Sequence, residues 1–147
     1  MSIKIKMAVS KVYEVELDIK GDDRGSLIAV ENLKEVPFEI KRIYYIFGTK
    51  ADVARGFHAH KKLKQLLICV SGSVNIKCEY QDKIETHSLN SPSQGLYMEG
   101  LVWREMFDFS PDAVLLVLAS DFYNEYDYIR SYDNFNKLKK FSRSRDL

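Results

Sequence analysis

The sequence feature that most constrains the fold is a series of short alternating segments separated by turn residues. The clearest case is the run in which Val74, Ile76, Cys78 and Tyr80 alternate with polar residues. A period of two predicts a strand with one buried face. Comparable short segments predict further strands over residues 3–7, 12–17, 27–30, 38–47, 55–60, 66–70, 84–89, 95–98, 102–109 and 113–120.

Many short strands with frequent turn signals favour an all-β sandwich or barrel. Only the C-terminal segment departs from this pattern, because apolar side chains recur there at helical spacing. We therefore expect a short helix over about residues 131–141. The residues that follow it, Arg143–Leu147, are expected to form a frayed and solvated tail.

Composition excludes several classes of partner. The chain has 22 basic and 21 acidic residues, so its charge attracts neither nucleic acid nor a membrane surface. The N-terminal residues lack the apolar core of a signal peptide, and no apolar run approaches the ~18 residues of a membrane span. Cys69 and Cys78 lie in apolar strand segments, which favours buried free thiols over a disulfide. We expect one cytoplasmic domain over residues 1–147, with no nucleic-acid partner and no membrane association.

A His-x-His pair, His58 and His60, lies on one of the predicted strands. Side chains two positions apart on a strand share a face, ~6–7 Å apart, so two of the three histidines should be neighbours. One histidine on an apolar strand is commonly a hydrogen-bonded core residue. Two on one face, preceded by Arg55-Gly56, indicate a functional site. The third, His87, stands in a polar strand and is predicted to be a surface residue.

The spacing around this pair resembles the first cupin motif, in which a carboxylate and a glycine follow the two histidines. Here those positions hold Gln65 and Gly72, and Arg104 stands where the second cupin motif supplies a third histidine. A divalent ion prefers neutral imidazoles with a carboxylate. A guanidinium ~4 Å from the ion would cost several kcal/mol at an effective dielectric near 20. We therefore predict no metal and no other cofactor, and assign the imidazoles to proton transfer.

Longer motifs resemble the bacterial dTDP-sugar 3,4-ketoisomerases over about residues 22–136. These motifs occupy residues 42–47, 55–63, 95–97, 102–106 and 118–130. The resemblance implies a metal-free cupin jelly-roll barrel that converts dTDP-4-keto-6-deoxyglucose to a 3-keto isomer. The product would supply a transaminase that makes dTDP-3-amino-3,6-dideoxyhexoses for cell-surface glycans such as the O-antigen of lipopolysaccharide. The resemblance also implies a homodimer in which N-terminal strands are exchanged.

The catalytic roles follow from the same resemblance. It assigns His60 as the acid–base group at carbon, and His58 with Tyr44 as the proton shuttle between the two sugar oxygens. The reverse assignment of the two histidines remains open. No redox cofactor is required, because the carbonyl migrates through an enediol by proton transfer.

Five further residues are candidates for substrate binding: Arg24, Arg55, Lys62, Gln65 and Arg104. Arg55 can stabilise an enolate or bind phosphate. Strict alternation would turn it away from the histidines, so this role requires a β-bulge. Lys62 lies in a lysine-rich loop that is either a solvated surface or a contributor to phosphate binding.

The configuration of the product at C4 receives mixed signals. Asp23–Ser26 resembles the galacto-forming branch of the family, whereas Trp103-Arg104-Glu105 resembles the gluco-forming branch. We take the galacto product as the expectation and the gluco product as the alternative. Other functions compatible with the motifs are a dTDP-4-keto-sugar 3,5-epimerase, a metal-dependent cupin, and a non-catalytic sugar-nucleotide-binding cupin.

Overall fold

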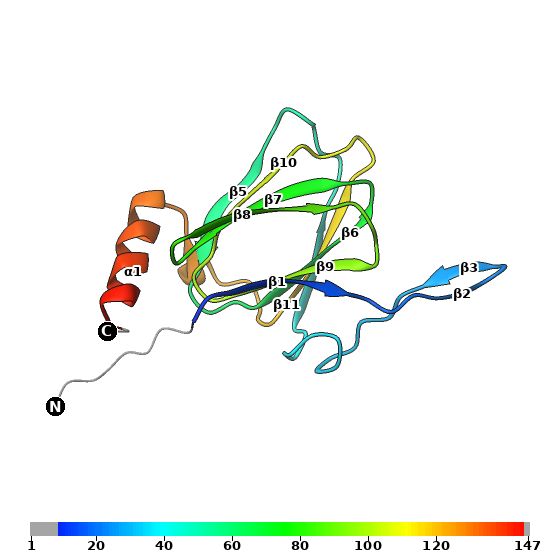
Figure 1. Cartoon of the computed structure of the whole chain (residues 1–147), viewed down its shortest axis with the longest axis horizontal. Helices are drawn as coiled ribbons and strands as arrows, with labels where there is room; N and C mark the ends of the chain where they lie inside the picture. The colour runs from blue at the N-terminus through cyan, green and yellow to red at the C-terminus, as the bar shows by residue number, and fades with distance from the viewer. Residues whose placement is uncertain (1–8, 146–147) are drawn as a thin grey trace.

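The computed structural model describes residues 9–145, which form two five-stranded antiparallel sheets that face each other (Figure 1). In spatial order, the first sheet contains β1 (Lys11–Glu16), β9 (Gln94–Glu99), β6 (Gln65–Ser71), β11 (Val114–Ala119) and β4 (Arg42–Ile46). The second contains β12 (Tyr128–Ile129), β5 (Arg55–His60), β10 (Trp103–Phe107), β7 (Val74–Tyr80) and β8 (Lys83–Leu89). The remaining elements are the hairpin β2 (Lys20–Asp22) and β3 (Gly25–Leu27), the 3₁₀ helix η1 (Glu125–Asp127) and the helix α1 (Tyr132–Arg145). The predicted all-β fold with a C-terminal helix is confirmed.

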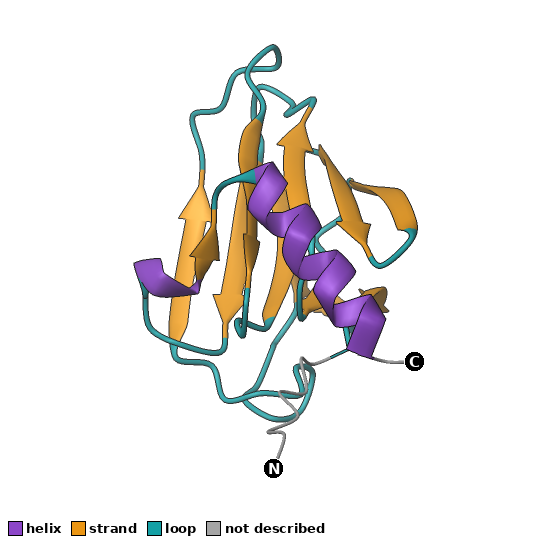
Figure 2. Cartoon of the chain, turned by 90° about the vertical axis from the view of Figure 1, so that its left-hand side faces the viewer, coloured by secondary structure: helices purple, strands orange, loops and turns teal. Residues whose placement is uncertain are grey.

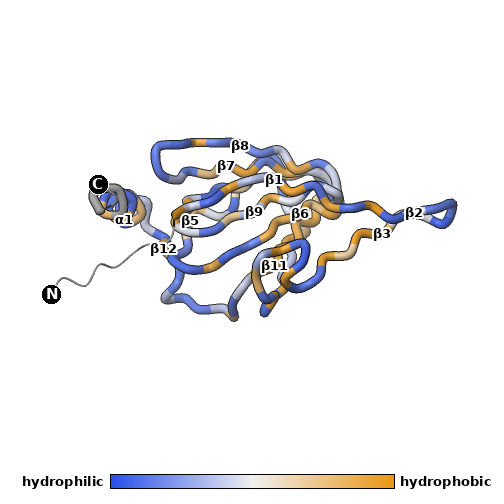
Figure 3. The backbone as a smooth tube through the Cα atoms, turned by 60° about the horizontal axis from the view of Figure 1, so that its bottom comes forward, coloured by the Kyte–Doolittle hydropathy of each residue, from blue (hydrophilic) through white to orange (hydrophobic). Residues whose placement is uncertain are grey.

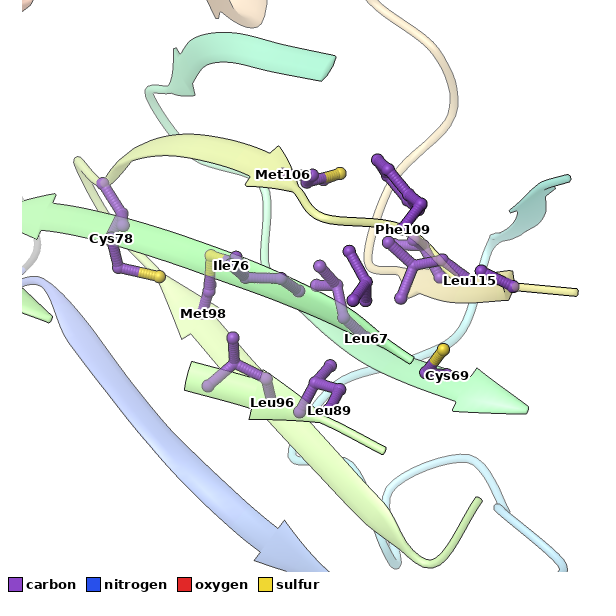
Figure 4. Packing of buried hydrophobic residues seen from close by; sticks show 14 of the residues in the cluster. Leu67, Cys69, Ile76, Cys78, Leu89, Leu96, Met98, Met106, Phe109 and Leu115 are labelled. Carbon is purple, nitrogen blue, oxygen red and sulfur yellow. The ribbon is translucent and has the colours of Figure 1, made fainter. Parts of the chain in front are cut away.

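The space between the sheets is filled by apolar side chains from both of them. Figure 4 shows Leu67 and Leu96 of the first sheet lying close to Ile76 of the second, within one buried cluster. Cys69 and Cys78 belong to this cluster and are free thiols, as predicted. The alternation that predicted β7 is therefore the alternation between this core and the outer face of the second sheet.

Strand β6 is buried on both faces, which explains its continuous apolar sequence. Leu67 points into the barrel, whereas Leu66 and Ile68 join a second cluster with Phe38 and Tyr97 on the outer face of the first sheet. The segment 28–40 covers this outer face. Figure 3 shows the resulting contrast between hydrophobic β6 and β11 and the hydrophilic edge strand β8.

Helix α1 packs on the outside of the second sheet, where it crosses the strands in Figure 2. Phe135 is fully buried and lies 5.7 Å from the ring of Trp103, between ring centroids. The Tyr132 hydroxyl donates to Glu79 on β7 at 2.7 Å. Trp103 is therefore a core residue. The helix continues to Arg145, so the prediction of a frayed tail is wrong for Arg143–Arg145.

The N-terminal part contains the main differences from the predicted elements. The strand predicted over residues 3–7 lies outside the described residues. The strand predicted over residues 27–30 is wrong, because Gly25–Leu27 pairs with Lys20–Asp22 instead, and the next residues pack on the second cluster without strand pairing. The strand predicted over residues 38–47 is shorter, since only Arg42–Ile46 pair with β11. Both errors arose because apolar residues in these segments pack against the second cluster without pairing their backbone with a strand.

Two other observations concern the molecular surface. His87 was predicted to be a surface residue, but its side chain is only 17% exposed and bridges Glu14 of β1 and Glu85 of β8, each at 3.0 Å. It thus joins the edge strands of the two sheets. Within residues 9–145, no helix has the length and hydropathy needed to cross a membrane.

Candidate active site

Five of the predicted site residues project into one end of the barrel. His58 and His60 come from β5, Gln65 from β6, Arg104 from β10 and Tyr44 from β4. The strand register places Arg104 directly opposite His58 on one side and Cys78 on the other. Directly opposite residues share a face of an antiparallel pair, so this register alone brings the guanidinium to the imidazole.

A β-bulge in β5 aims these side chains. Arg104 pairs with His58 but Glu105 pairs with Gly56, which leaves Phe57 as an extra residue on β5. Gly56 and Phe57 have φ values of +96° and +55°, and a Cβ on Gly56 would lie 3.0 Å from the carbonyl oxygen of Arg104. The extra residue turns Arg55 to the same sheet face as His58, which is the condition that its predicted role required.

A hydrogen-bonded chain connects the guanidinium to the tyrosine. Arg104 Nη1 donates to Gln65 Oε1, and Gln65 Nε2 donates to the Tyr44 hydroxyl oxygen at 2.9 Å. Because the Tyr44 oxygen is the acceptor in that bond, its own O–H remains available to a substrate. Burial raises the pKa of Tyr44, which keeps it a neutral donor at physiological pH.

Arg104 is a buried cation without an anionic partner. Its residue exposure is 1%, and its recorded acceptors are neutral oxygens of Gln65 and Val102. Among the ion pairs formed within residues 9–145, none includes Arg104, and its Nε has no partner. Burial lowers its pKa, yet a guanidinium stays charged in proteins. The pocket therefore favours a ligand on which negative charge develops.

Both pocket histidines are neutral bases. Burial, followed by the charge of Arg104, lowers the pKa of His58 to about 3. Burial also lowers the pKa of His60 to about 4, although a hydrogen bond to Asp127 opposes this shift. The two differ in access: His58 is half-buried, whereas His60 has no exposed surface. Their ring centroids are 4.9 Å apart.

Sequence reasoning missed two residues that contact this pair. The Asp127 Oδ2 lies 3.0 Å from His60 Nδ1, and the ring of Tyr128 lies 4.4 Å from that of His60 and 5.1 Å from that of His58. Both follow or end η1, where β12 pairs with β5. They fall within a motif that the resemblance used, but nothing in the sequence indicated which strand that motif pairs with.

Three predicted binding residues lie outside the buried cluster. Arg55 and Lys62 are exposed, and Lys62 lines a cavity of about 50 Å³ beside His60. Arg24 is 90% exposed and bonded to Asp22 at the tip of the β2–β3 hairpin. Figure 1 shows this hairpin extending away from the barrel, on the side opposite α1. Within one copy of the chain, the structure does not bring Arg24 to the histidines.

The donor set does not fit a divalent metal ion. Within residues 9–145, no three His, Cys, Asp or Glu side chains are grouped so that they could hold one. The two positions that complete a metal-binding cupin hold Gln65 and the cationic Arg104, and they bond to each other. The pocket of this cupin-type barrel offers proton acceptors, a hydroxyl donor and a positive charge, a set of groups suited to acid–base chemistry.

Comparisons with known proteins identify the family. The family model described as FdtA, WxcM-like, C-terminal, matches residues 10–140. A TDP-4-oxo-6-deoxy-α-D-glucose-3,4-oxoisomerase from Aneurinibacillus thermoaerophilus is 56% identical over 116 residues, which is 79% of this chain and 84% of that protein. A 3,4-ketoisomerase from Helicobacter canadensis superposes with a TM-score of 0.85 at 53% identity, covering 88% of this chain and 97% of that one.

A third relative is known with nucleotide bound. The sugar 3,4-ketoisomerase QdtA from Thermoanaerobacterium thermosaccharolyticum, in complex with TDP, gives a TM-score of 0.86 at 48% identity and covers 88% of this chain and 95% of that chain. The chain therefore belongs to the family of dTDP-sugar 3,4-ketoisomerases, and it is an isomerase with a cupin-type β fold.

Proposed function

We propose that the protein converts dTDP-4-keto-6-deoxy-D-glucose to a dTDP-3-keto-6-deoxyhexose by metal-independent acid–base catalysis. The substrate is suggested by the name of the relative from Aneurinibacillus thermoaerophilus. The observation that carries the mechanism is the placement of a neutral imidazole, His58, and a neutral hydroxyl, Tyr44, beside the unpaired cation Arg104. Proton abstraction next to a ketone needs a base, a donor to the carbonyl oxygen and stabilisation of the enediolate.

We assign the carbon chemistry to His58. It is the half-buried member of the pair, whereas His60 has no exposed surface. One ring nitrogen of His58 bonds to the backbone of Gly56, so the other can accept the C3 proton and return it to C4. This exchanges the roles that the family resemblance implied for the two histidines. The His60 ring lies beside that of His58, with 4.9 Å between the ring centroids.

Tyr44 shuttles the proton between the oxygens. Its O–H passes a proton to O4 as the C3 proton leaves, and the resulting phenolate takes the proton of the C3 hydroxyl as the new carbonyl forms. Arg104 stabilises the negative charge that passes through the enediolate. Each proton removed is returned, so the cycle needs no oxidant or reductant.

A single base working on one face of the ring predicts the stereochemical outcome. In a D-gluco ring the hydrogens at C3 and C4 lie on opposite faces. A base that takes the C3 hydrogen and returns it to C4 from the same side therefore gives the galacto configuration. We propose this 3-keto-6-deoxygalactose product as the substrate of a 3-aminotransferase that makes 3-amino-3,6-dideoxyhexoses, in the reducing cytoplasm that the two free thiols suit.

We further propose a homodimer that exchanges the N-terminal hairpin. All six residues of β2 and β3 are exposed, and an isolated two-stranded hairpin is marginally stable in water. Beside it, on the outer face of the first sheet, is an apolar groove of about 480 Å³ lined by Ile68, Val70 and Leu116 among others. A second copy could pack on this face and place its Arg24 near the phosphates, together with Arg55 and Lys62 of the first.

The proposal is tested by incubating the protein with dTDP-4-keto-6-deoxyglucose, a 3-aminotransferase and an amino donor, and identifying the amino sugar by NMR. The expected product is the 3-amino-3,6-dideoxy sugar with the galacto configuration. The variant His58→Asn should give no detectable turnover. The matched control His87→Asn changes a histidine outside the pocket and should keep the wild-type rate.

Other results would overturn specific parts of the proposal. A gluco product would refute the argument that one base works on one face of the ring, but it would still support the ketoisomerase activity. Deuterium incorporation at C3 and C5 in heavy water, with the carbonyl still at C4, would show a 3,5-epimerase. Binding of dTDP without any turnover would show a non-catalytic module.

A further inference from the structure

Asp127 is the one carboxylate in direct contact with a pocket histidine among the described residues. Its Oδ2 lies 3.0 Å from His60 Nδ1, and its Oδ1 accepts the backbone N–H of Lys62 at 2.8 Å. The backbone around it is also fixed, because the Lys61 N–H donates to the Asp127 carbonyl and β12 pairs with β5 directly after it. Each carboxylate oxygen therefore has a defined partner.

These partners decide which nitrogen of His60 carries its hydrogen. Burial disfavours ionisation of Asp127, but the hydrogen bonds from His60 and the Lys62 amide outweigh it and lower the pKa of Asp127. An ionised carboxylate only accepts hydrogen bonds, and a neutral imidazole has a single N–H. At physiological pH the hydrogen must therefore lie on Nδ1, which leaves Nε2 with a bare lone pair.

Two buried polar atoms of the pocket have no hydrogen-bond partner within the described part of the chain. One is His60 Nε2, and the other is the Nε of Arg104, which is a donor. The positive charges of Arg104 and Arg42 both lower the pKa of His60, so the ring stays neutral and carries a single N–H. A hydroxyl donor, such as that of a sugar, would satisfy His60 Nε2, and an oxygen acceptor would satisfy the Arg104 Nε.

We propose that Asp127 is a positioning residue that holds His60 in the Nδ1–H tautomer, so that its Nε2 accepts a hydrogen bond from a substrate hydroxyl beside Arg104. The inference rests on the proposed function. It adds a second, non-equivalent histidine role: His58 moves the proton at carbon, and His60 orients the bound sugar through one of its hydroxyls. Asp127 acts only through His60.

The variant Asp127→Asn tests this with little change in shape. The side-chain oxygen still accepts the Lys62 N–H, which turns the amide NH₂ toward His60 Nδ1. That nitrogen must then become the acceptor, so the hydrogen moves to Nε2 and the lone pair in the pocket is lost. We expect kcat to fall by about 10²–10⁴-fold, by analogy with the carboxylate-to-amide change in a serine-protease triad, with a much smaller change in KM.

The decisive readout is the tautomer itself. In protein labelled with ¹⁵N-histidine, the wild type should show a pyrrole-like Nδ1 and a pyridine-like Nε2 for His60, and Asp127→Asn should reverse the two. Asp127→Glu, which keeps a carboxylate, should keep the wild-type tautomer and recover part of kcat. Glu125→Gln, in the same 3₁₀ helix but paired with Arg130, should leave both readouts unchanged.

The outcomes separate this proposal from the function on which it rests. Unchanged kcat in Asp127→Asn, or a fall in kcat with the tautomer unchanged, would overturn the positioning role. A fall that Asp127→Glu does not relieve, accompanied by a lower Tm, would show that Asp127 is merely structural. Wild-type protein with the predicted tautomer but no isomerase activity would instead overturn the proposed function.

Discussion

The exposed β2–β3 hairpin allows a quantitative prediction of the subunit on which Arg24 acts. In one copy of the chain the β2–β3 hairpin extends away from the barrel (Figure 1). The Arg24 side chain at its tip is 90% exposed. If Arg24 binds the phosphates of a substrate held by the other copy, it acts in trans. The variant Arg24→Ala should then fold normally and lose about 10–100-fold in kcat/KM, as expected for one charge-assisted hydrogen bond.

Mixing two defective variants measures this directly. Arg24→Ala and His58→Asn, combined in equal amounts and allowed to exchange subunits, should form about half heterodimers in a two-fold symmetric dimer. In each heterodimer, the pocket that retains His58 receives Arg24 from the other chain, so one site in two is complete. The mixture should therefore recover about one quarter of the wild-type activity per chain, well above either variant alone.

The assay is the coupled 3-aminotransferase reaction, with size-exclusion chromatography and light scattering to establish the dimer. The control is a mixture of Tyr44→Phe with His58→Asn, which alters two residues that the structure places in the same barrel. No heterodimer of that pair has a complete site, so no activity should return. Recovery of less than a few per cent in the first mixture, with subunit exchange demonstrated, would refute the action of Arg24 in trans.

Three further predictions follow from the pocket. Since the pKa of His58 is lowered to about 3, kcat/KM should show no inflection near 6.5, the ordinary pKa of histidine; Arg104→Met removes one cause of that shift and should move the acid limb to higher pH. Gly56→Ala should lower stability by about 1–3 kcal/mol and reduce kcat, because a Cβ would press on the Arg104 carbonyl at a positive φ, as measured by denaturant unfolding and kinetics. Prolonged dialysis against a chelator should leave kcat unchanged, whereas a loss restored by a divalent ion would contradict the metal-independent mechanism.

Local sequence patterns predicted most of the barrel strands and the position of the histidine pair. The alternation of Val74, Ile76, Cys78 and Tyr80 gave β7 with its correct buried face, because a half-buried strand leaves its period in the sequence. The same period of two predicted that His58 and His60 lie on one strand and share a face, and both lie on β5 in the barrel.

Features that depend on pairing between distant segments could not be predicted in this way. The bulge at Gly56 arises from the register of β5 with β10, and without it Arg55 would point outward. Asp127 contacts His60, which lies 67 positions earlier in the sequence, because β12 pairs with β5. Strand β12 has only two residues, and so short a segment carries no pattern from which this pairing could be predicted. The segment after β3 is apolar enough to resemble a strand but is held by side-chain packing alone.

The solitary charge of Arg104 has a consequence for inhibitor design. A neutral pyranose supplies no negative charge to pair with Arg104. A flat, negatively charged mimic of the enediolate would form an ion pair with Arg104 and accept a hydrogen bond from the Tyr44 hydroxyl. Such compounds should bind more tightly than the substrate itself, as expected when a site is complementary to the transition state and the enediolate that resembles it rather than to the ground state. Their advantage should largely disappear against Arg104→Met.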